Sequence, residues 1–270
     1  MRTIRLAGMM GVALLGTMAY GNLLGKYYAG VNIDVNGVLQ TQGLTERFRR
    51  VDANIDFWDG SRYYRWQPIS GQPDNYTVEW TGYIRIDVPG EYGFGTISDD
   101  GSQIWIDGQM IVDNGEGQWY DWEDNMGQNE PGEPNQPVYL NVGYHAIMVR
   151  FYEGPTYDGI ELWWLQPGTG PSDIPYYGTT FHGTPPTYNP NTNWAIVPAS
   201  VLVTPEEYNG LTCAADLYSD GVINLLDFAI LAAEWQTLTP VYGDLTGDST
   251  VDMEDLAQFV IFWLEPCLVS

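Results

Sequence analysis

Hydrophobic and polar residues alternate with a period of about two from residue 22 to about residue 165. A strand with one buried face shows this alternation, because successive side chains point to opposite sides of the sheet. Turn-forming pairs such as Pro89-Gly90 and Asp107-Gly108 separate the alternating runs. The pattern predicts a mainly β chain folded as an antiparallel β-sandwich. In the clearest runs, one face carries Val78, Trp80, Ile84 and Ile86, then His145, Ile147, Val149 and Phe151, then Ile160, Leu162 and Trp164.

The segment 168–193 interrupts this pattern with proline, glycine, threonine and tyrosine. Such a composition is typical of a linker or of a long irregular loop. Residues 194–202 resume a strand-like pattern, so we interpret 168–193 as a loop inside a sandwich that spans 22–203. The linker that leads to the next unit is then short and falls at 204–212.

From Cys213 onward, acidic segments alternate with apolar runs of helical spacing at 228–235 and 256–264. The two halves of this region repeat one another at an offset of 28 residues. The duplication predicts a small C-terminal α-helical domain of the EF-hand-like kind at 213–267. The matching pairs are Asp216 and Asp244, Leu217 and Leu245, Asp220 and Asp248, Asp227 and Asp255, Ala229 and Ala257, and Trp235 and Trp263.

Each half carries oxygen-bearing residues at the spacing of a calcium loop, in which positions 1, 3, 5, 7, 9 and 12 supply the ligands. Ile223 and Val251, at the eighth positions, are expected to pair with each other across the two loops. The candidate ligands of the first loop are Asp216, Asp220, Val222 through its carbonyl, Asn224 and Asp227, with Tyr218 at the third position. Those of the second loop are Asp244, Thr246, Asp248, Thr250 through its carbonyl, Asp252 and Asp255.

This arrangement resembles a type I dockerin, a module of two calcium loops that each precede a helix. Two departures are Tyr218, which replaces an acidic or amide ligand, and Ser249, which replaces the turn glycine of the second loop. The resemblance implies Ca²⁺ binding and docking to a cohesin-like protein through Leu225-Leu226 and Met253-Glu254. These residues are more apolar than is usual in dockerins, so packing within the chain is an alternative. A helical pair that binds no calcium is another.

The chain has 10 basic and 35 acidic residues and a formal charge of −25. Such a surface repels phosphate backbones and anionic lipid headgroups, which excludes nucleic acid as a natural partner. Clustered carboxylates suit hard cations such as Ca²⁺, although acidity can also serve solubility alone.

The first 19 residues have the pattern of a signal peptide: two arginines, an apolar run and small residues before a cleavage site. The apolar run at 6–18 is too short to span a bilayer, and we expect no transmembrane segment. The pattern predicts a secreted, extracellular protein. In that oxidising compartment Cys213 and Cys267, the two cysteines of the chain, are expected to form a disulfide around the C-terminal domain. Two separate buried thiols are the alternative.

The N-terminal region also carries a set of short motifs in a fixed order. Together they resemble the protective-antigen domain (PA-fourteen family), a lectin-like β-sandwich found in toxins, glycosidases and yeast flocculins. The resemblance spans about residues 22–203 and includes the strand-like segment at 196–200. The motifs include LGKYY at 24–28, VEWTGYI at 78–84, SDDGS at 98–102, IWIDG at 104–108 and FYE at 151–153.

In the lectin members of that family, two consecutive aspartates bind one calcium ion, which coordinates sugar hydroxyl groups. The resemblance assigns this role to Asp99 and Asp100, whose linking peptide bond is cis in those relatives. Asp158 is the candidate further ligand, because the asparagine expected in its loop is absent. A tight Asp-Asp-Gly turn without a ligand is the alternative. The aromatic residues that could stack on a sugar are Trp119, Tyr120, Trp122 and Tyr157.

No nucleophile elbow, zinc-protease motif or cysteine nucleophile occurs, and the two histidines are isolated. We therefore expect a non-catalytic protein, although a glycoside hydrolase site made of two carboxylates cannot be located from sequence. The prediction is a secreted, calcium-dependent carbohydrate-binding protein with a docking module that belongs to polysaccharide-degrading machinery. The alternative is a calcium-stabilised interaction or structural module that binds no sugar.

Overall fold

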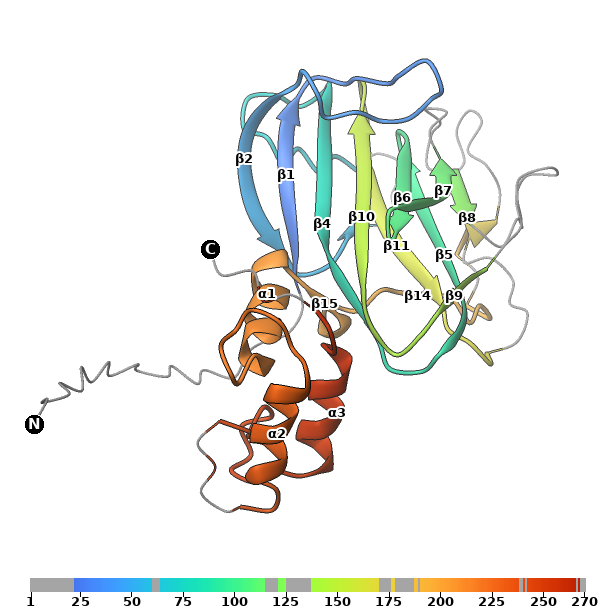
Figure 1. Ribbon diagram of the computed structural model, residues 1–270. Coiled ribbons are helices and arrows are strands. Elements are labelled where there is room, and N and C mark those ends of the chain that lie inside the picture. Colours follow the sequence, from blue (N-terminus) through green and yellow to red (C-terminus); the bar gives the residue numbers. More distant parts are fainter. Residues whose placement is uncertain are drawn as a thin grey trace, which may run out of the picture.

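Two antiparallel sheets stand above a small helical unit in the computed structural model (Figure 1). The residues that the structure describes are 22–59, 64–114, 121–124, 137–169, 176–177, 187–188, 190–237, 240, 242–265 and 267. The predicted signal peptide and most of the predicted loop at 168–193 lie outside these residues. Within that loop, two short strands, β12 (Tyr176–Tyr177) and β13 (Thr187–Tyr188), pair with each other.

The first sheet has seven strands, and its central strands β4 and β10 pair along eleven residues each. Its order is β2 (Thr45–Asp52), β1 (Leu23–Ala29), β4 (Tyr76–Ile86), β10 (Gly143–Glu153), β6 (Ser102–Ile106) and β7 (Gln109–Asn114). The short strand β15 (Leu202–Val203) pairs with β4 beyond the end of β1.

The second sheet has six strands, of which β5 and β11 form the central pair. Its order is β14 (Ala195–Ile196), β11 (Gly159–Leu165), β5 (Gly90–Asp99) and β8 (Asp121–Asp124). Two further strands complete it, β3 (Asp56–Phe57) beside β11 and β9 (Val138–Leu140) beside β5.

The main core lies between the two sheets and contains the faces that the alternation predicts. Val78, Trp80 and Phe151 from the first sheet meet Phe94 and Leu162 from the second. Burying such side chains contributes roughly 1.5–3 kcal/mol each to stability. The predicted mainly β, antiparallel architecture is therefore confirmed.

Three helices follow the sandwich: α1 (Pro205–Ala215), α2 (Leu225–Ala233) and α3 (Met253–Ile261), preceded by a short 3₁₀ turn, η1 (Ala199–Val201). The interpretation of 204–212 as a linker differs from the structure, because α1 begins there. Thr204 and Glu207 form a reciprocal capping box, and Pro205 occupies the first turn, where its missing N–H costs nothing. In the described part of the chain, no helix has the length and apolar character needed to cross a membrane.

The helical unit packs against the lower end of the sandwich. Its core, which includes Phe259 and Phe262, is contacted by Tyr144 of β10. The ring of Tyr144 stacks on Phe262 with centroids 5.8 Å apart, and Tyr83 of β4 stacks on Tyr208 of α1 at 3.7 Å. Aromatic contacts therefore join the two units.

Candidate functional site

The reversal between β5 and β6 carries the two aspartates that sequence analysis selected. Asp99 is the last residue of β5, and β6 begins at Ser102. The Asp99–Asp100 peptide bond is cis. Below the turn, the hydroxyl of Ser102 lies 2.8 Å from those of Thr96 and of Ser98. This buried hydroxyl network fixes the two strands beneath the loop.

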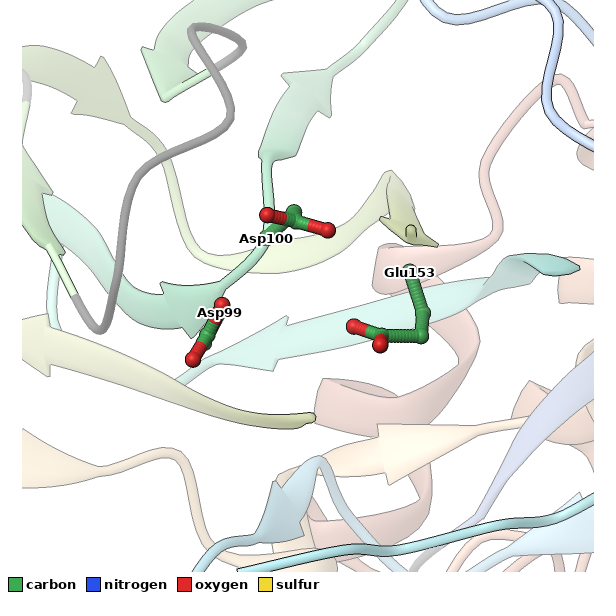
Figure 2. A group of neighbouring side chains, drawn as sticks. All are labelled: Asp99, Asp100 and Glu153. Carbon is green, nitrogen blue, oxygen red and sulfur yellow. The ribbon is translucent and has the colours of Figure 1, made fainter. Parts of the chain in front are cut away.

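A third carboxylate, that of Glu153, reaches the same place from β10. Figure 2 shows its side chain extending toward Asp99 and Asp100. One oxygen from each of the three residues lies within 4.8 Å of the others. A calcium ion about 2.4 Å from each oxygen permits ligand separations up to about 4.8 Å. The spacing therefore fits a single shared cation.

Two of the three carboxylates are buried, that of Asp100 is half-buried, and several of their oxygens have no hydrogen-bond partner. Glu153 is fully buried and Asp99 is 5% exposed. Oδ2 of Asp99 and both Oε atoms of Glu153 lack a partner. A buried, unpaired carboxylate is strongly destabilising unless it is neutralised by a proton or a cation. A hard cation such as Ca²⁺ would satisfy all of these oxygens at once.

Burial makes the carboxylates of Glu153 and Asp99 hold their protons more tightly. It raises the pKa of Glu153 to about 10, and the negative charges of Asp100, Asp158 and Asp99 add to that shift. Burial, together with the charges of Asp100 and Asp158, raises the pKa of Asp99 to about 8. Without a cation, protons therefore remain on this site at neutral pH.

The carboxylate of Asp100 is held in place by the loop that follows β10. The backbone N–H of Gly154 donates a hydrogen bond to Oδ2 of Asp100, with the two atoms 2.6 Å apart. A Cβ atom at residue 154 would come within 2.9 Å of the same oxygen. The absence of a side chain at Gly154 thus permits the close approach of the Asp100 carboxylate.

Asp158, the predicted further ligand, is not part of this group of three. Its Oδ1 accepts a hydrogen bond from the backbone N–H of Trp66 at 2.6 Å. Its Oδ2 accepts from the backbone N–H of Gln67 at 3.1 Å and from the hydroxyl of Tyr76. Asp158 lies close enough to raise the pKa of Asp99, but its own oxygens anchor the loop that precedes β4.

Glu153 was missed by sequence analysis, although the alternation of β10 contains the signal. Ile147, Val149 and Phe151 occupy the core face, and the next inward position is Glu153. A carboxylate that continues an apolar face is a buried charge, which requires a partner. The predicted sugar-stacking residues Trp119 and Tyr120 lie outside the described residues.

Of the remaining aromatic candidates, Trp122 lies in β8, and the side chain of Tyr157 is half-buried. Tyr157 packs against a second cluster on the outer face of the second sheet, which contains Trp58, Trp163 and Trp194. The guanidinium of Arg65 lies 5.9 Å from its ring centroid. Tyr157 therefore contributes to packing beside the site.

The first C-terminal loop also gathers three carboxylates. Oxygens of Asp216, Asp220 and Asp227 lie within 4.8 Å of one another. Here, however, backbone N–H groups occupy the oxygens: Oδ2 of Asp216 accepts from Gly221 at 2.9 Å, and Oδ1 of Asp227 accepts from Tyr218 at 2.7 Å. Each carboxylate oxygen keeps a second lone pair for a cation.

The second loop repeats this pattern at matching positions. Oδ2 of Asp244 accepts from the backbone N–H of Ser249 at 2.9 Å, and Oδ2 of Asp255 accepts from Asp252 at 2.8 Å. The hydroxyl of Thr246 donates to Oδ1 of Asp255 at 3.1 Å. Among the described residues, the carboxylates of this loop do not form a group of three as tight as that of the first loop.

The remaining predicted ligands occupy helix-cap and loop positions. Asn224 and Asp252 are the N-caps of α2 and α3, and each forms a capping box with the aspartate three residues later. The N–H of Val222 donates to Asp220 at 3.1 Å, and that of Thr250 donates to Asp248 at 2.8 Å. Both loops are therefore shaped by their own hydrogen bonds.

The expected pairing of Ile223 with Val251 does not appear in the described backbone hydrogen bonds. The carbonyl of Ile223 accepts from the N–H of Leu264 at 2.8 Å, and that of Val251 accepts from Gln236 at 2.7 Å. Each loop is thus tied to the segment that follows the helix of the other half. Both side chains are fully buried in the common core.

Cys213 and Cys267 form a disulfide across 54 residues of sequence. The bond joins α1 to the segment after α3. The N–H of Cys267 also donates to the carbonyl of Gly221 at 3.0 Å, which places this segment against the first loop.

A family model described as the PA14 domain matches residues 35–178. The chain belongs to the PA14 domain family. The resemblance of the sandwich is therefore confirmed, and Asp99, Asp100 and Glu153 lie within the matched part of this PA14 domain.

One curated relative is the anti-sigma-I factor RsgI3 of Acetivibrio thermocellus, 29% identical over 119 residues. These residues are 44% of this chain and 16% of that protein. The chain thus spans about a sixth of the length of the relative, so the likeness concerns one part of a much longer protein.

Solved structures that are similar to this chain include domains of adhesins. The PA14 sugar-binding domain from an RTX adhesin has a TM-score of 0.40 and 16% identity, over 56% of this chain and 93% of that one. The epithelial adhesin 6 A domain from Candida glabrata, solved with Galb1-3GlcNAc, has a TM-score of 0.39 and 15% identity, over 56% and 83%. An anti-sigma factor domain-containing protein has a TM-score of 0.45 and 21% identity, over 69% and 48%.

Proposed function

We propose that this protein is an exported, non-catalytic PA14 protein that binds carbohydrate through Ca²⁺ at Asp99 and Asp100. Its C-terminal unit is a dockerin-like calcium module that attaches it to a partner. The observation that carries the proposal is the set of buried carboxylate oxygens without partners at the β5–β6 turn. Export rests on the N-terminal residue pattern alone.

The chemistry of the site supports a sugar ligand. Calcium takes about six to eight oxygens, more than the carboxylates of the turn supply, so coordination positions remain for water or for ligand hydroxyls. Vicinal sugar hydroxyls can replace two waters on such an ion. The named sugar-binding domains among the structural neighbours are consistent with this use of the fold.

The placement of the two units suits simultaneous binding at both ends. Tyr144 of β10 touches the helical unit, whereas Glu153 of the same strand belongs to the carboxylate site. Nine residues of strand separate them, which is about 30 Å at roughly 3.4 Å per residue. A sugar bound at the turn would therefore not compete with a partner bound to the helices.

Exposed apolar side chains on α2 and α3 support the docking role. Leu225 and Met253, at matching positions in the two halves, are 69% and 65% exposed. Phe228 of α2 and Trp263, which follows α3, are also exposed, and their rings lie 6.2 and 5.7 Å from the ring of the buried Phe259. Exposed apolar patches of this kind mark interaction sites.

The charge of this unit indicates the kind of partner. All 10 lysines and arginines of the chain lie at or before residue 150, so the helical unit has no basic side chain. A second copy of this unit would bring two acidic surfaces together, which is unfavourable. A cohesin-like partner with an apolar centre and a basic rim fits better.

The test of the sugar proposal is a glycan array probed with the mature protein in calcium and in chelator. We expect binding that requires calcium and disappears in Asp99→Asn. A suitable control is Asp113→Asn, because Asp113 is exposed on β7 and lies outside the carboxylate group. A blank array from folded, calcium-loaded protein would favour the second candidate, an interaction module without a sugar ligand.

A further inference from the structure

We infer that Glu153 is a direct ligand of the cation at the β5–β6 turn and makes this a site of three carboxylates. The inference rests on the proposed cation at Asp99 and Asp100 and adds a ligand beyond the aspartate pair and Asp158. The geometry places one oxygen of Glu153 within 4.8 Å of oxygens from both aspartates.

The burial of Glu153 leaves it without another role. Its side chain is fully buried, and neither of its carboxylate oxygens has a hydrogen-bond partner. Of the ion pairs among the described residues, none includes Glu153 or either aspartate. An uncompensated buried carboxylate is costly, so a residue with only a structural role would be expected to have a donor nearby.

Other buried acids of the same sandwich show what such a structural role looks like. Glu79 pairs with Arg150 and Lys26 at 2.9 and 3.5 Å. Asp52 accepts hydrogen bonds from the side chains of Tyr27 and Trp80 at 2.5 and 2.8 Å. The chain therefore provides donors for these buried acids, whereas Asp99 and Glu153 at the turn keep oxygens without a partner.

The position of Glu153 on a strand affects how the site binds. β10 pairs with β4 through the register that joins Glu153 to Tyr76, so its backbone is fixed by the sheet. A ligand held by a strand needs little ordering when the ion binds, which favours affinity. Three carboxylates also give a formal charge of −3, which attracts a trivalent ion more strongly than a divalent one.

The experiment compares Glu153→Gln with the wild-type protein as the full mature chain. Calcium titration by calorimetry should show one site weakened by at least about 10-fold, because each anionic ligand contributes to calcium affinity. The C-terminal sites should be unchanged. Terbium(III), titrated by luminescence, should lose more affinity than calcium at this site, because the lost ligand charge matters more for the higher ion charge.

Thermal unfolding provides a second measurement that a structural role would not reproduce. In chelator, Glu153→Gln should unfold at a higher temperature than wild type, because a neutral amide removes a buried acid without a partner. In saturating calcium it should unfold at a lower temperature, because a ligand is missing. Glu161→Gln is the matched control: Glu161 is buried and accepts a hydrogen bond from Trp163 at 3.0 Å. It should leave the calcium affinity unchanged.

The outcomes separate this inference from the proposed function. Equal destabilisation of Glu153→Gln with and without calcium, or an unchanged calcium affinity, would overturn the ligand role of Glu153. If Asp99→Asn abolishes the site while Glu153→Gln does not, the cation proposal stands and this inference fails. If both variants lose calcium and the glycan array is blank, Glu153 is a ligand and the sugar proposal fails. Should Glu153→Gln not fold, Glu153→Asp, which withdraws the carboxylate by one methylene, should give an intermediate calcium affinity.

Discussion

Three carboxylates meet at the β5–β6 turn and three meet in the first C-terminal loop, but their surroundings differ. At the turn, Asp99 and Glu153 are buried and have oxygens without partners. In the loop, Asp216 and Asp227 accept hydrogen bonds from backbone N–H groups at 2.7–3.1 Å. The same residue types therefore depend on an added cation to different degrees.

The number of acids in a cluster therefore does not determine how much the cluster depends on a bound ion for stability. Backbone N–H groups compensate much of the charge in the loop, since hydrogen bonds to a charged group contribute about 1.5–3 kcal/mol each. At the turn the interior supplies few donors, so an ion or protons must neutralise the charge. Calcium should therefore stabilise the sandwich site more than the loops.

The largest effect is expected from removing the covalent constraint of the C-terminal unit. Replacing both cysteines, Cys213→Ser with Cys267→Ser, should destabilise this unit by about 4 kcal/mol, because a disulfide across 54 residues restricts the unfolded chain. Thermal unfolding in calcium would show an earlier transition for the helical unit. Loss of calcium binding at the β5–β6 turn in this variant would contradict the independence of the two regions.

Measuring stability against pH in the presence of a chelator tests whether the buried acids at the β5–β6 turn hold protons when no ion is bound. The pKa of Asp99 is about 8 in the folded protein, raised by burial from a usual 3.8, so the folded state holds a proton that the unfolded state has released. Stability should be fully present below about pH 4 and should fall progressively as the pH rises toward 8.

The control for this series is Asp99→Asn, which should make the decline shallower because one of the two titrating groups is gone, while Glu153, whose pKa burial raises to about 10, remains. Saturating calcium should flatten it as well, since the ion replaces the protons. The temperature shift caused by calcium should accordingly be larger at pH 8 than at pH 5. A wild-type stability that rises from pH 5 to pH 8 in chelator would contradict the assignment.

Removing a carboxylate from a C-terminal loop tests whether these residues stabilise the helical unit without an ion. Asp227→Ala and Asp255→Ala should each cost about 1–2 kcal/mol even in chelator, because each residue closes a capping box without any ion. Denaturant unfolding with and without calcium measures both contributions. A cost that appears only in calcium would show that these carboxylates act as ligands alone.

The smallest effect concerns the turn of the second loop. Ser249 adopts a φ of 77°, and Gly221, its counterpart in the first loop, has a φ of 90°. Glycine adopts this conformation without the penalty that a side chain brings. Ser249→Gly should therefore stabilise the helical unit by roughly 0.5–1 kcal/mol in denaturant unfolding. Gly221→Ser, the reverse change, should destabilise it.

The aspartate pair of the site could be predicted from a short stretch of sequence, but the surroundings of Asp158 could not. Asp99 and Asp100 are adjacent, and their turn between two strands is visible in the alternation. The position of Asp158 in a loop predicts a ligand, but its oxygens accept hydrogen bonds from donors in the segment at 66–76. Those donors are far away in sequence, so no local pattern could indicate them.

Patterns in the sequence were enough to predict the strands, their buried faces, the acidic turn and the duplicated acidic loops. These depend on periods of two and of 28 residues, and both can be read along a single stretch of chain. Only the tertiary structure brought Glu153 to Asp99 and Asp100, because β10 and β6 are neighbours in the first sheet. It also made a helix of the predicted linker at 204–212, where Tyr208 packs on Tyr83. Pairing between distant strands and packing between units decide such contacts, and neither has a local pattern.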